Sequence, residues 1–158
     1  MHIVNIIFVS ANLNFFMHNN RPILIVEDDV EEQELLTEVF KSLPYPVNFL
    51  FVNNGEEALE FLRKSIQTPQ LIISDVNMPG MSGLEFKNRI NNDKQLNELR
   101  IPFIFFSGAG LNFTVTLAYQ LNIQGFFIKG SDIVEIKADM FRIIDYWRHC
   151  QIPNNSKI

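Results

Sequence analysis

Short apolar runs alternate along this chain with longer stretches in which apolar residues recur at helical spacing. Runs of about four to eight apolar residues bounded by turn signals are typical of buried parallel strands. The predicted strands cover residues 23–27, 47–52, 71–75, 103–106 and 126–128. Strand and helix therefore alternate five times from Arg21 onward, which is the pattern of an α/β protein.

The stretches between these runs show the features of amphipathic helices. Asp28 or Asp29 can cap the first helix, because Glu31 and Glu32 follow at capping-box spacing. Pro44 ends that helix. The sequence predicts further helices around residues 58–62, over 84–90, over 111–121 and over about 133–147, with a loop at 78–83 and a polar stretch from 91 to 100.

Parallel strands joined by right-handed helical crossovers form a twisted sheet with helices on both faces. We therefore expect an α/β, doubly wound fold with a five-stranded parallel sheet, in one domain over residues 21–151. Residues 1–20 are interpreted as an N-terminal extension without chemistry, although the run at 3–9 could also form an extra edge strand. Residues 152–158 are expected to be a polar tail.

The composition excludes several classes of protein. Apolar residues make up 47 % and charged residues 20 %, an ordinary globular mixture. The net charge of −5 argues against a nucleic-acid-binding surface, which needs a basic face. Cys150 is the single cysteine, so no internal disulfide can form and a cytoplasmic location is expected. The most apolar stretch, at 3–9, is too short to cross a bilayer, so we expect no membrane segment.

Polar side chains follow four of the predicted strands. Glu27 and Asp28 come at the end of the first strand, Asp75 ends the third, and Ser107 and Lys129 follow the fourth and fifth. Open α/β sheets bind ligands at the carboxyl edge of the strands, so these side chains should meet in one crevice. Two acids, a nucleophilic carboxylate, a hydroxyl and an amine together suit the chemistry of a magnesium-dependent aspartyl phosphate.

Each of these residues also has a simpler interpretation. Acids at the start of a helix are favoured by the helix dipole whatever the function. That explanation is sufficient for Asp29, Glu31, Glu32 and Glu34, which we interpret as a solvated helix face. A strand-end Ser or Lys is usually only solvated, and an acid after a strand can simply begin a turn. The combination at one edge supports the functional interpretation more than any single residue does.

Four segments resemble the response-regulator receiver domains of two-component signalling. They are Val26–Asp29, Ser74–Gly83, Phe106–Gly108 and Phe126–Lys129, and the resemblance extends from Pro22 to about Gln151. It implies the flavodoxin-like receiver fold and a phosphoryl group taken from a histidine kinase or a histidine phosphotransfer protein. It also implies Mg²⁺ as the cofactor.

The resemblance also implies roles for individual acids. Asp75 occupies the position of the phosphoacceptor. Asp28 and Asp75 would bind Mg²⁺ directly, together with the backbone carbonyl of Asn77. Glu27 would contact the ion through a water molecule.

Two strand-end residues and one aromatic residue fall on further positions of this family. Ser107 and Lys129 match the residues that hold phosphoryl oxygens, and Ser107 and Phe126 match the switch positions. Phe126 has no hydroxyl and is equally well explained as a core aromatic residue. The family usually has proline after the lysine, where this chain has Gly130. We therefore expect a more mobile loop and a less fixed Lys129.

Three less specific segments resemble the single-domain regulators that partner cyanobacterial phytochromes. They are Gly55–Lys64, the polar stretch before Ile101 and Asp145–Pro153. The resemblance predicts a stand-alone regulator without a DNA-binding output, which acts on a downstream protein partner or pairs with a second copy of itself. Because such a protein catalyses only its own phosphorylation and dephosphorylation, whether it is an enzyme is a matter of definition.

Two other functions remain open. A protein-binding module of the same fold that works without phosphorylation is supported only by Gly130. A phosphohydrolase with Asp75 as nucleophile is disfavoured, because such enzymes usually have an acid two residues further on, where this chain has Asn77.

Overall fold

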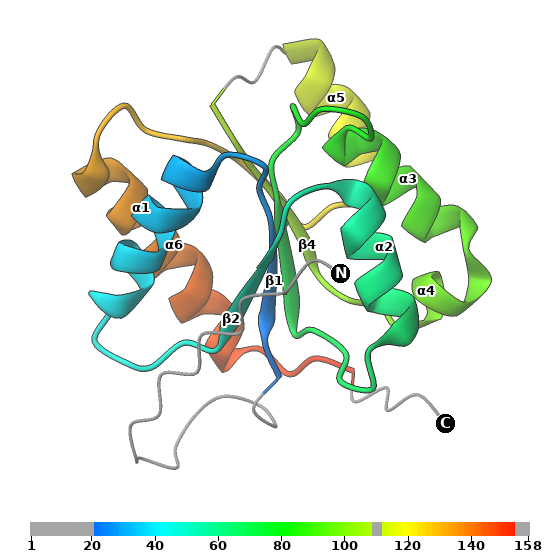
Figure 1. The fold of residues 1–158 in the computed structure, drawn as a ribbon, viewed down its shortest axis with the longest axis horizontal. Coiled ribbons are helices and arrows are strands. Elements are labelled where there is room, and N and C mark those ends of the chain that lie inside the picture. The colour runs from blue at the N-terminus through cyan, green and yellow to red at the C-terminus, as the bar shows by residue number, and fades with distance from the viewer. Residues whose placement is uncertain (1–20, 109–111, 154–158) are drawn as a thin grey trace.

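The structure is a computed structural model that describes residues 21–108 and 112–153. Strands and helices alternate along these residues, as the hydrophobic pattern predicts (Figure 1). The strands are β1 (Ile23–Val26), β2 (Phe49–Val52), β3 (Leu71–Ser74), β4 (Phe103–Ser107) and β5 (Gly125–Ile128). The helices are α1 (Val30–Lys41), α2 (Gly55–Lys64), α3 (Gly83–Asn92), α4 (Lys94–Glu98), α5 (Asn112–Gln120) and α6 (Ile133–His149). The predicted N-terminal extension, with its alternative edge strand, lies outside the described residues.

All five strands form one parallel sheet in the order β2-β1-β3-β4-β5. This order confirms the predicted doubly wound α/β fold. The strand order reverses between β1 and β3, which is where ligands bind in sheets of this kind. Val26 lies opposite Ser74 in the register, so the residues that follow β1 and β3 lie side by side.

Helices cover both faces of the sheet (Figure 1). α1 and α6 pack on one face, and α2 and α3 pack on the other. Successive residues of β1 alternate between these layers, with Ile23 and Ile25 toward α1 and Leu24 and Val26 toward α2. Every residue of β1, β3 and β4 is buried, as expected for strands covered on both faces.

Asp29, rather than Asp28, caps α1. Its carboxylate accepts hydrogen bonds from the N–H groups of Glu31 and Glu32, at 2.8 and 3.4 Å. This bonding satisfies N–H groups at the start of the helix. The side chain of Asp28 lies instead with the acids at the end of the sheet.

One short helix is missing from the sequence-based prediction. α4 lies in the stretch interpreted as polar, where Asp93 accepts hydrogen bonds from the N–H groups of Gln95 and Leu96. Leu96 and Leu99 are buried against the core. A helix of five residues is too short to show a helical period, so the hydrophobic pattern could not predict it.

Several element ends also differ from the prediction. β1 ends at Val26 and β3 at Ser74, so the acids that follow lie just beyond the strands. β2 begins at Phe49 instead of 47, and α6 continues to His149 instead of 147. The predicted start of the helix at 111–121 lies outside the described residues.

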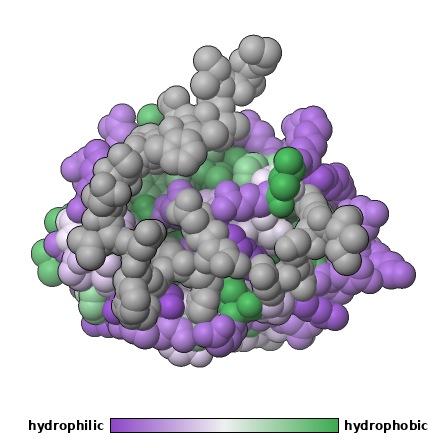
Figure 2. Space-filling model, turned by 90° about the horizontal axis from the view of Figure 1, so that it is seen from below, coloured by the Kyte–Doolittle hydropathy of each residue, from purple (hydrophilic) through white to green (hydrophobic). Residues whose placement is uncertain are grey.

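At the end of the molecule opposite the carboxyl edge, Arg21 joins the start of β1 to two other segments. Its guanidinium donates to the carbonyl oxygens of Thr68 and Pro69, both at 2.7 Å, and to that of Pro153 at 2.9 Å. Pro153 belongs to the predicted tail, which therefore begins in contact with the domain. Figure 2 looks at this lower end, where hydrophilic residues (purple) surround smaller hydrophobic areas (green). Within the described ranges, no helix has the length and apolar character needed to cross a membrane.

Candidate functional site

Three acids meet at the carboxyl edge of the sheet. Glu27 and Asp28 follow β1 and Asp75 follows β3, and one carboxylate oxygen from each lies within 4.8 Å of the others. The backbone holds this arrangement, because the Asp75 N–H donates to the Val26 carbonyl at 3.0 Å. Glu27 is buried, whereas Asp28 and Asp75 are half-buried. The structure thus brings together the three acids that the sequence placed in one crevice.

The loop after β3 packs tightly behind Asp75. The Val76 N–H donates to Oδ1 of Asp75 at 2.7 Å, and the Gly83 N–H donates to the Val76 carbonyl at 2.8 Å. A Cβ added at Gly83 would overlap the Asp75 carbonyl, so a side chain there would displace the loop. Asn77 lies exposed in the same loop, two residues after Asp75.

Glu27 forms an ion pair with Lys129, which follows β5. Lys129 Nζ lies 2.8 Å from Oε2 of Glu27, and both side chains are at least nine-tenths buried. Burial raises the pKa of Glu27 to about 7, and the ammonium of Lys129 limits that rise. Burial by itself would lower the pKa of Lys129, but hydrogen bonds to Glu27 and Glu32 outweigh burial and raise it. The amine is therefore an ammonium at neutral pH.

Ser107 presents a hydroxyl that has no partner. It ends β4, is fully buried, and its Oγ makes no hydrogen bond to any described residue. Its carbonyl accepts the Lys129 N–H at 2.9 Å, which holds the ends of β4 and β5 together. A Cβ added at the next residue, Gly108, would have no described heavy atom within 4 Å. The hydroxyl is therefore a buried donor with no described acceptor.

Most of the chain matches one known family. The family model of the response regulator receiver domain matches residues 23–141. The chain belongs to the response regulator receiver family. The match begins at β1 and reaches into α6, so it contains every residue of the crevice.

Two relatives show how this receiver compares in sequence. The transcriptional regulatory protein CrdR of Helicobacter pylori (strain ATCC 700392 / 26695) is 32 % identical over 125 residues, 79 % of this chain and 55 % of CrdR. The chain thus spans about half the length of that relative. Response regulator Rcp1 of Synechocystis sp. (strain ATCC 27184 / PCC 6803 / Kazusa) is 25 % identical over 130 residues, 79 % of this chain and 87 % of Rcp1.

Two solved structures share the fold. The phosphorylated cyanobacterial phytochrome response regulator RcpA superposes with a TM-score of 0.77 at 24 % identity, over 85 % of this chain and 99 % of RcpA. The Mn²⁺-bound form of Rcp1 superposes with a TM-score of 0.73 at 24 % identity, over 84 % of this chain and 99 % of Rcp1.

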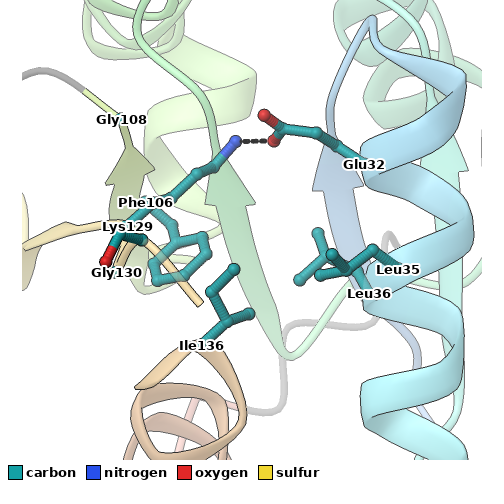
Figure 3. Close-up of a pocket in the computed structure, with 9 residues that line it drawn as sticks. Glu32, Leu35, Leu36, Phe106, Gly108, Lys129, Gly130 and Ile136 are labelled. Atoms are coloured by element: carbon teal, nitrogen blue, oxygen red, sulfur yellow. Dashed lines mark hydrogen bonds and ion pairs between the residues drawn. The ribbon is translucent and has the colours of Figure 1, made fainter. Parts of the chain in front are cut away.

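Glu32 has a contact in this receiver that the sequence did not predict. The sequence predicts a solvated position on the helix, and the side chain is 43 % exposed, but its carboxylate also forms a second ion pair with Lys129 (Figure 3). Asp29, Glu31 and Glu34 are exposed, as predicted. An acid in the first turn of α1 looks the same in the sequence whether it faces solvent or a lysine about a hundred residues away, so the pattern could not show this contact.

Gln33 is a further residue of the crevice that the sequence did not indicate. Its side-chain amide donates to the Glu27 carbonyl at 2.7 Å and to Oδ1 of Asn53 at 3.1 Å. It therefore fixes the backbone that carries the buried acid. Glutamine is ordinary on a helix, so no signal in the sequence distinguishes it.

The two departures from the family pattern have local explanations. Phe126 is half-buried and its ring lies 5.7 Å from that of Phe105, which agrees with the interpretation as a core aromatic residue. Gly130 lies so close to Glu135 that an added Cβ would overlap that side chain. The Glu135 carboxylate accepts the Ser131 N–H at 3.0 Å, so the loop has a hydrogen bond of its own. With two carboxylates on Lys129 as well, the lysine is held more firmly than Gly130 led us to expect.

Proposed function

We propose that this receiver accepts a phosphoryl group on Asp75 from a histidine kinase or a histidine phosphotransfer protein, with Mg²⁺ bound beside it. The observation that supports this most is the set of three carboxylates within 4.8 Å of one another, next to a buried hydroxyl without a partner among the described residues. Acids at this spacing repel one another, so the cluster favours a bound cation.

The oxygen donors at the edge fit a hard divalent cation. Mg²⁺ prefers carboxylate and carbonyl oxygens and keeps several waters. Asp28 and Asp75 would bind it directly together with the Asn77 carbonyl, and Glu27, which also pairs with Lys129, would act through water. When bound, the cation would reduce the repulsion between Asp75 and an incoming phosphoryl anion. The relative Rcp1, solved with Mn²⁺, supports a divalent ion here.

The remaining residues of the crevice would handle the phosphoryl group. A carboxylate oxygen of Asp75 would bond to phosphorus while the donor's own bond to phosphorus breaks. Because the Val76 N–H occupies Oδ1 of Asp75, Oδ2 is the oxygen with no described hydrogen bond. The Ser107 hydroxyl would donate to one phosphoryl oxygen and the Lys129 ammonium to another, which stabilises the charge on the transferred group.

The signal would then pass to a protein partner or to a second copy of the chain. The proposal follows from the switch positions Ser107 and Phe126, which lie at the end of β4 and within β5. RcpA, solved in its phosphorylated form, is a relative in which such a modified state exists. A cytoplasmic location, expected from the single cysteine, is part of the same proposal.

Intact-protein mass spectrometry after incubation with acetyl phosphate and Mg²⁺ tests the proposal. We expect one added phosphoryl group that hydroxylamine removes, as for an acyl phosphate, and none in Asp75→Asn. Asp29→Asn is the matched control, because Asn caps a helix about as well as Asp and the residue lies outside the acid cluster. If the wild-type protein gains no phosphoryl group, the alternative of a phosphorylation-independent binding module is favoured instead.

A further inference from the structure

Glu32 gives Lys129 a second carboxylate that the acid cluster does not require. Among the described contacts, Lys129 Nζ donates to Glu32 (Figure 3) and to Glu27, and to no oxygen of Asp75. Glu32 is not one of the three acids that could hold a metal ion together. Its side chain is 43 % exposed, against 10 % for Lys129, so this ion pair lies at the rim of the crevice.

The two acids differ in what a bound cation would do to them. Glu27 belongs to the metal cluster, so a cation would attract its carboxylate and weaken its attraction for Lys129. Glu32 comes from the first turn of α1 and lies outside the metal cluster, so its attraction for the Lys129 ammonium would not be weakened in this way. In Figure 3 the side chain of Lys129 extends toward Glu32 on α1. Asp75 lies instead at the end of β3. Glu32 and a phosphoryl group on Asp75 would therefore attract the same ammonium in different directions.

We propose that Glu32 is a positioning residue, which holds Lys129 toward α1 until a phosphoryl group on Asp75 draws the ammonium away. The inference rests on the proposed function, because the competing group is the phosphoryl group of Asp75. It adds that the unphosphorylated state is stabilised by an ion pair that the phosphorylated state loses. Glu32 thus sets the balance between the two states without contacting the phosphoryl group.

Open space borders the side chain of Lys129 on the side of α1 and α6. A cavity of about 360 Å³ lies beside it between α1 and α6. Leu36, Phe106 and Ile136 line its apolar part (Figure 3). On that side the stem of Lys129 borders open space, so packing there does not by itself fix the side chain toward α1.

The first test measures whether Glu32 covers the ammonium in the unphosphorylated protein. Glu32→Gln, Glu31→Gln and wild type are treated with an amine-reactive reagent without metal, and labelling of Lys129 is followed by peptide mass spectrometry. Glu31 lies in the same turn and is exposed, so it is the matched control. Lys129 should react roughly two to five times faster in Glu32→Gln only, the range expected for loss of a partly exposed ion pair.

The second test measures competition, with beryllofluoride as the phosphoryl analogue in saturating Mg²⁺. Glu32→Gln should bind beryllofluoride roughly two to five times more tightly than wild type and Glu31→Gln. The gain should shrink at high ionic strength, because salt screens the ion pair that the variant lacks. Mg²⁺ affinity measured alone should be the same in all three proteins, since Glu32 lies outside the metal cluster. A merely structural effect of the substitution would not separate these two affinities.

The outcomes distinguish this inference from the proposed function. If wild type binds beryllofluoride and Glu32→Gln matches it or binds more weakly, Glu32 does not compete and the inference is wrong while the proposed function stands. Unchanged labelling of Lys129 in Glu32→Gln would equally refute the holding role. If wild type binds no beryllofluoride, the proposed function fails and the inference fails with it.

Discussion

Lys87 is a cation on the buried face of α3, and replacing it with methionine tests how much its burial destabilises the fold. The residue is only 7 % exposed, and its Nζ lies 5.3 Å from the ring centre of Phe103. Burial, and to a lesser extent the positive charge of Arg100, lower the pKa of Lys87 to about 8. Lys87 lies over Phe103 on the α2–α3 face of the sheet, whereas Lys129 lies over Phe106 on the α1–α6 face. Phosphorylation of Asp75 should therefore not depend on Lys87.

The size of the effect follows from the pKa in the two states. The pKa falls from 10.5 to about 8 on folding, which at about 1.4 kcal/mol per unit costs about 3 kcal/mol at pH 7. The contact with the Phe103 ring offsets about 1 kcal/mol of this. Methionine has a similar length and no charge. Lys87→Met should therefore raise the free energy of unfolding by about 2 kcal/mol at pH 7.

The stability advantage of Lys87→Met should decrease as the pH rises. Between pH 8 and 10.5 the unfolded chain binds more protons at this lysine than the folded protein does. Wild-type stability therefore rises through that window relative to the variant, and the advantage of Lys87→Met falls to about 1 kcal/mol or less at pH 10. Below pH 8 the advantage is fully present.

Urea unfolding at pH 7 and pH 10 measures both quantities. Circular dichroism and the fluorescence of Trp147, which packs against the core under α1 and α6, report the transition. Lys137→Met is the control, because Lys137 is exposed on α6. If Lys87→Met is less stable than wild type at pH 7, or if its advantage over Lys137→Met does not shrink at pH 10, the reasoning about Lys87 is refuted.

Two further predictions concern the crevice. Asp28→Ala should weaken Mg²⁺ binding roughly tenfold or more in calorimetry, because a hard cation loses an oxygen ligand, and an unchanged affinity would remove Asp28 from the site. Beryllofluoride with Mg²⁺ should change self-association or shift the backbone amide resonances of residues 125–131, because a group on Asp75 attracts Ser107 and leaves space that Phe126 can fill. If neither changes at full occupancy, the receiver does not switch through β5.

The position of the crevice could be predicted because strands buried on both faces leave a continuous apolar signature. β1 and β3 each appear as such a run, and each is followed directly by an acid. The parallel topology then requires Glu27 and Asp75 to lie at one edge, and the register of Val26 with Ser74 makes them neighbours. The apolar runs of the strands and the rule that parallel strands end at one edge of the sheet were sufficient to predict that Glu27 and Asp75 lie together.

The partners of Lys129 could not be predicted in the same way. Glu27 and Glu32 lie 102 and 97 residues before it, so no local period relates them to the lysine. Tertiary packing brings the first turn of α1 to the end of β5, and an acid that a helix dipole would favour in any case gains a second role there. Gln33 was missed for the same reason, since its contacts with Glu27 and Asn53 also depend on packing.

Two features at the carboxyl edge oppose stable packing, the Ser107 hydroxyl and the buried acid Glu27. Among the described buried side chains, only the Ser107 and Tyr45 hydroxyls lack a hydrogen-bond partner, and a buried unpaired hydroxyl costs about 1–3 kcal/mol. Glu27 is a buried acid in a cluster of acids. At the opposite end, each nitrogen of the buried Arg21 guanidinium donates to a carbonyl oxygen. The unpartnered Ser107 hydroxyl and the three acids gathered at the carboxyl edge are better explained by ligand binding than by faulty packing. A phosphoryl oxygen can accept from Ser107, and a cation can compensate the acids.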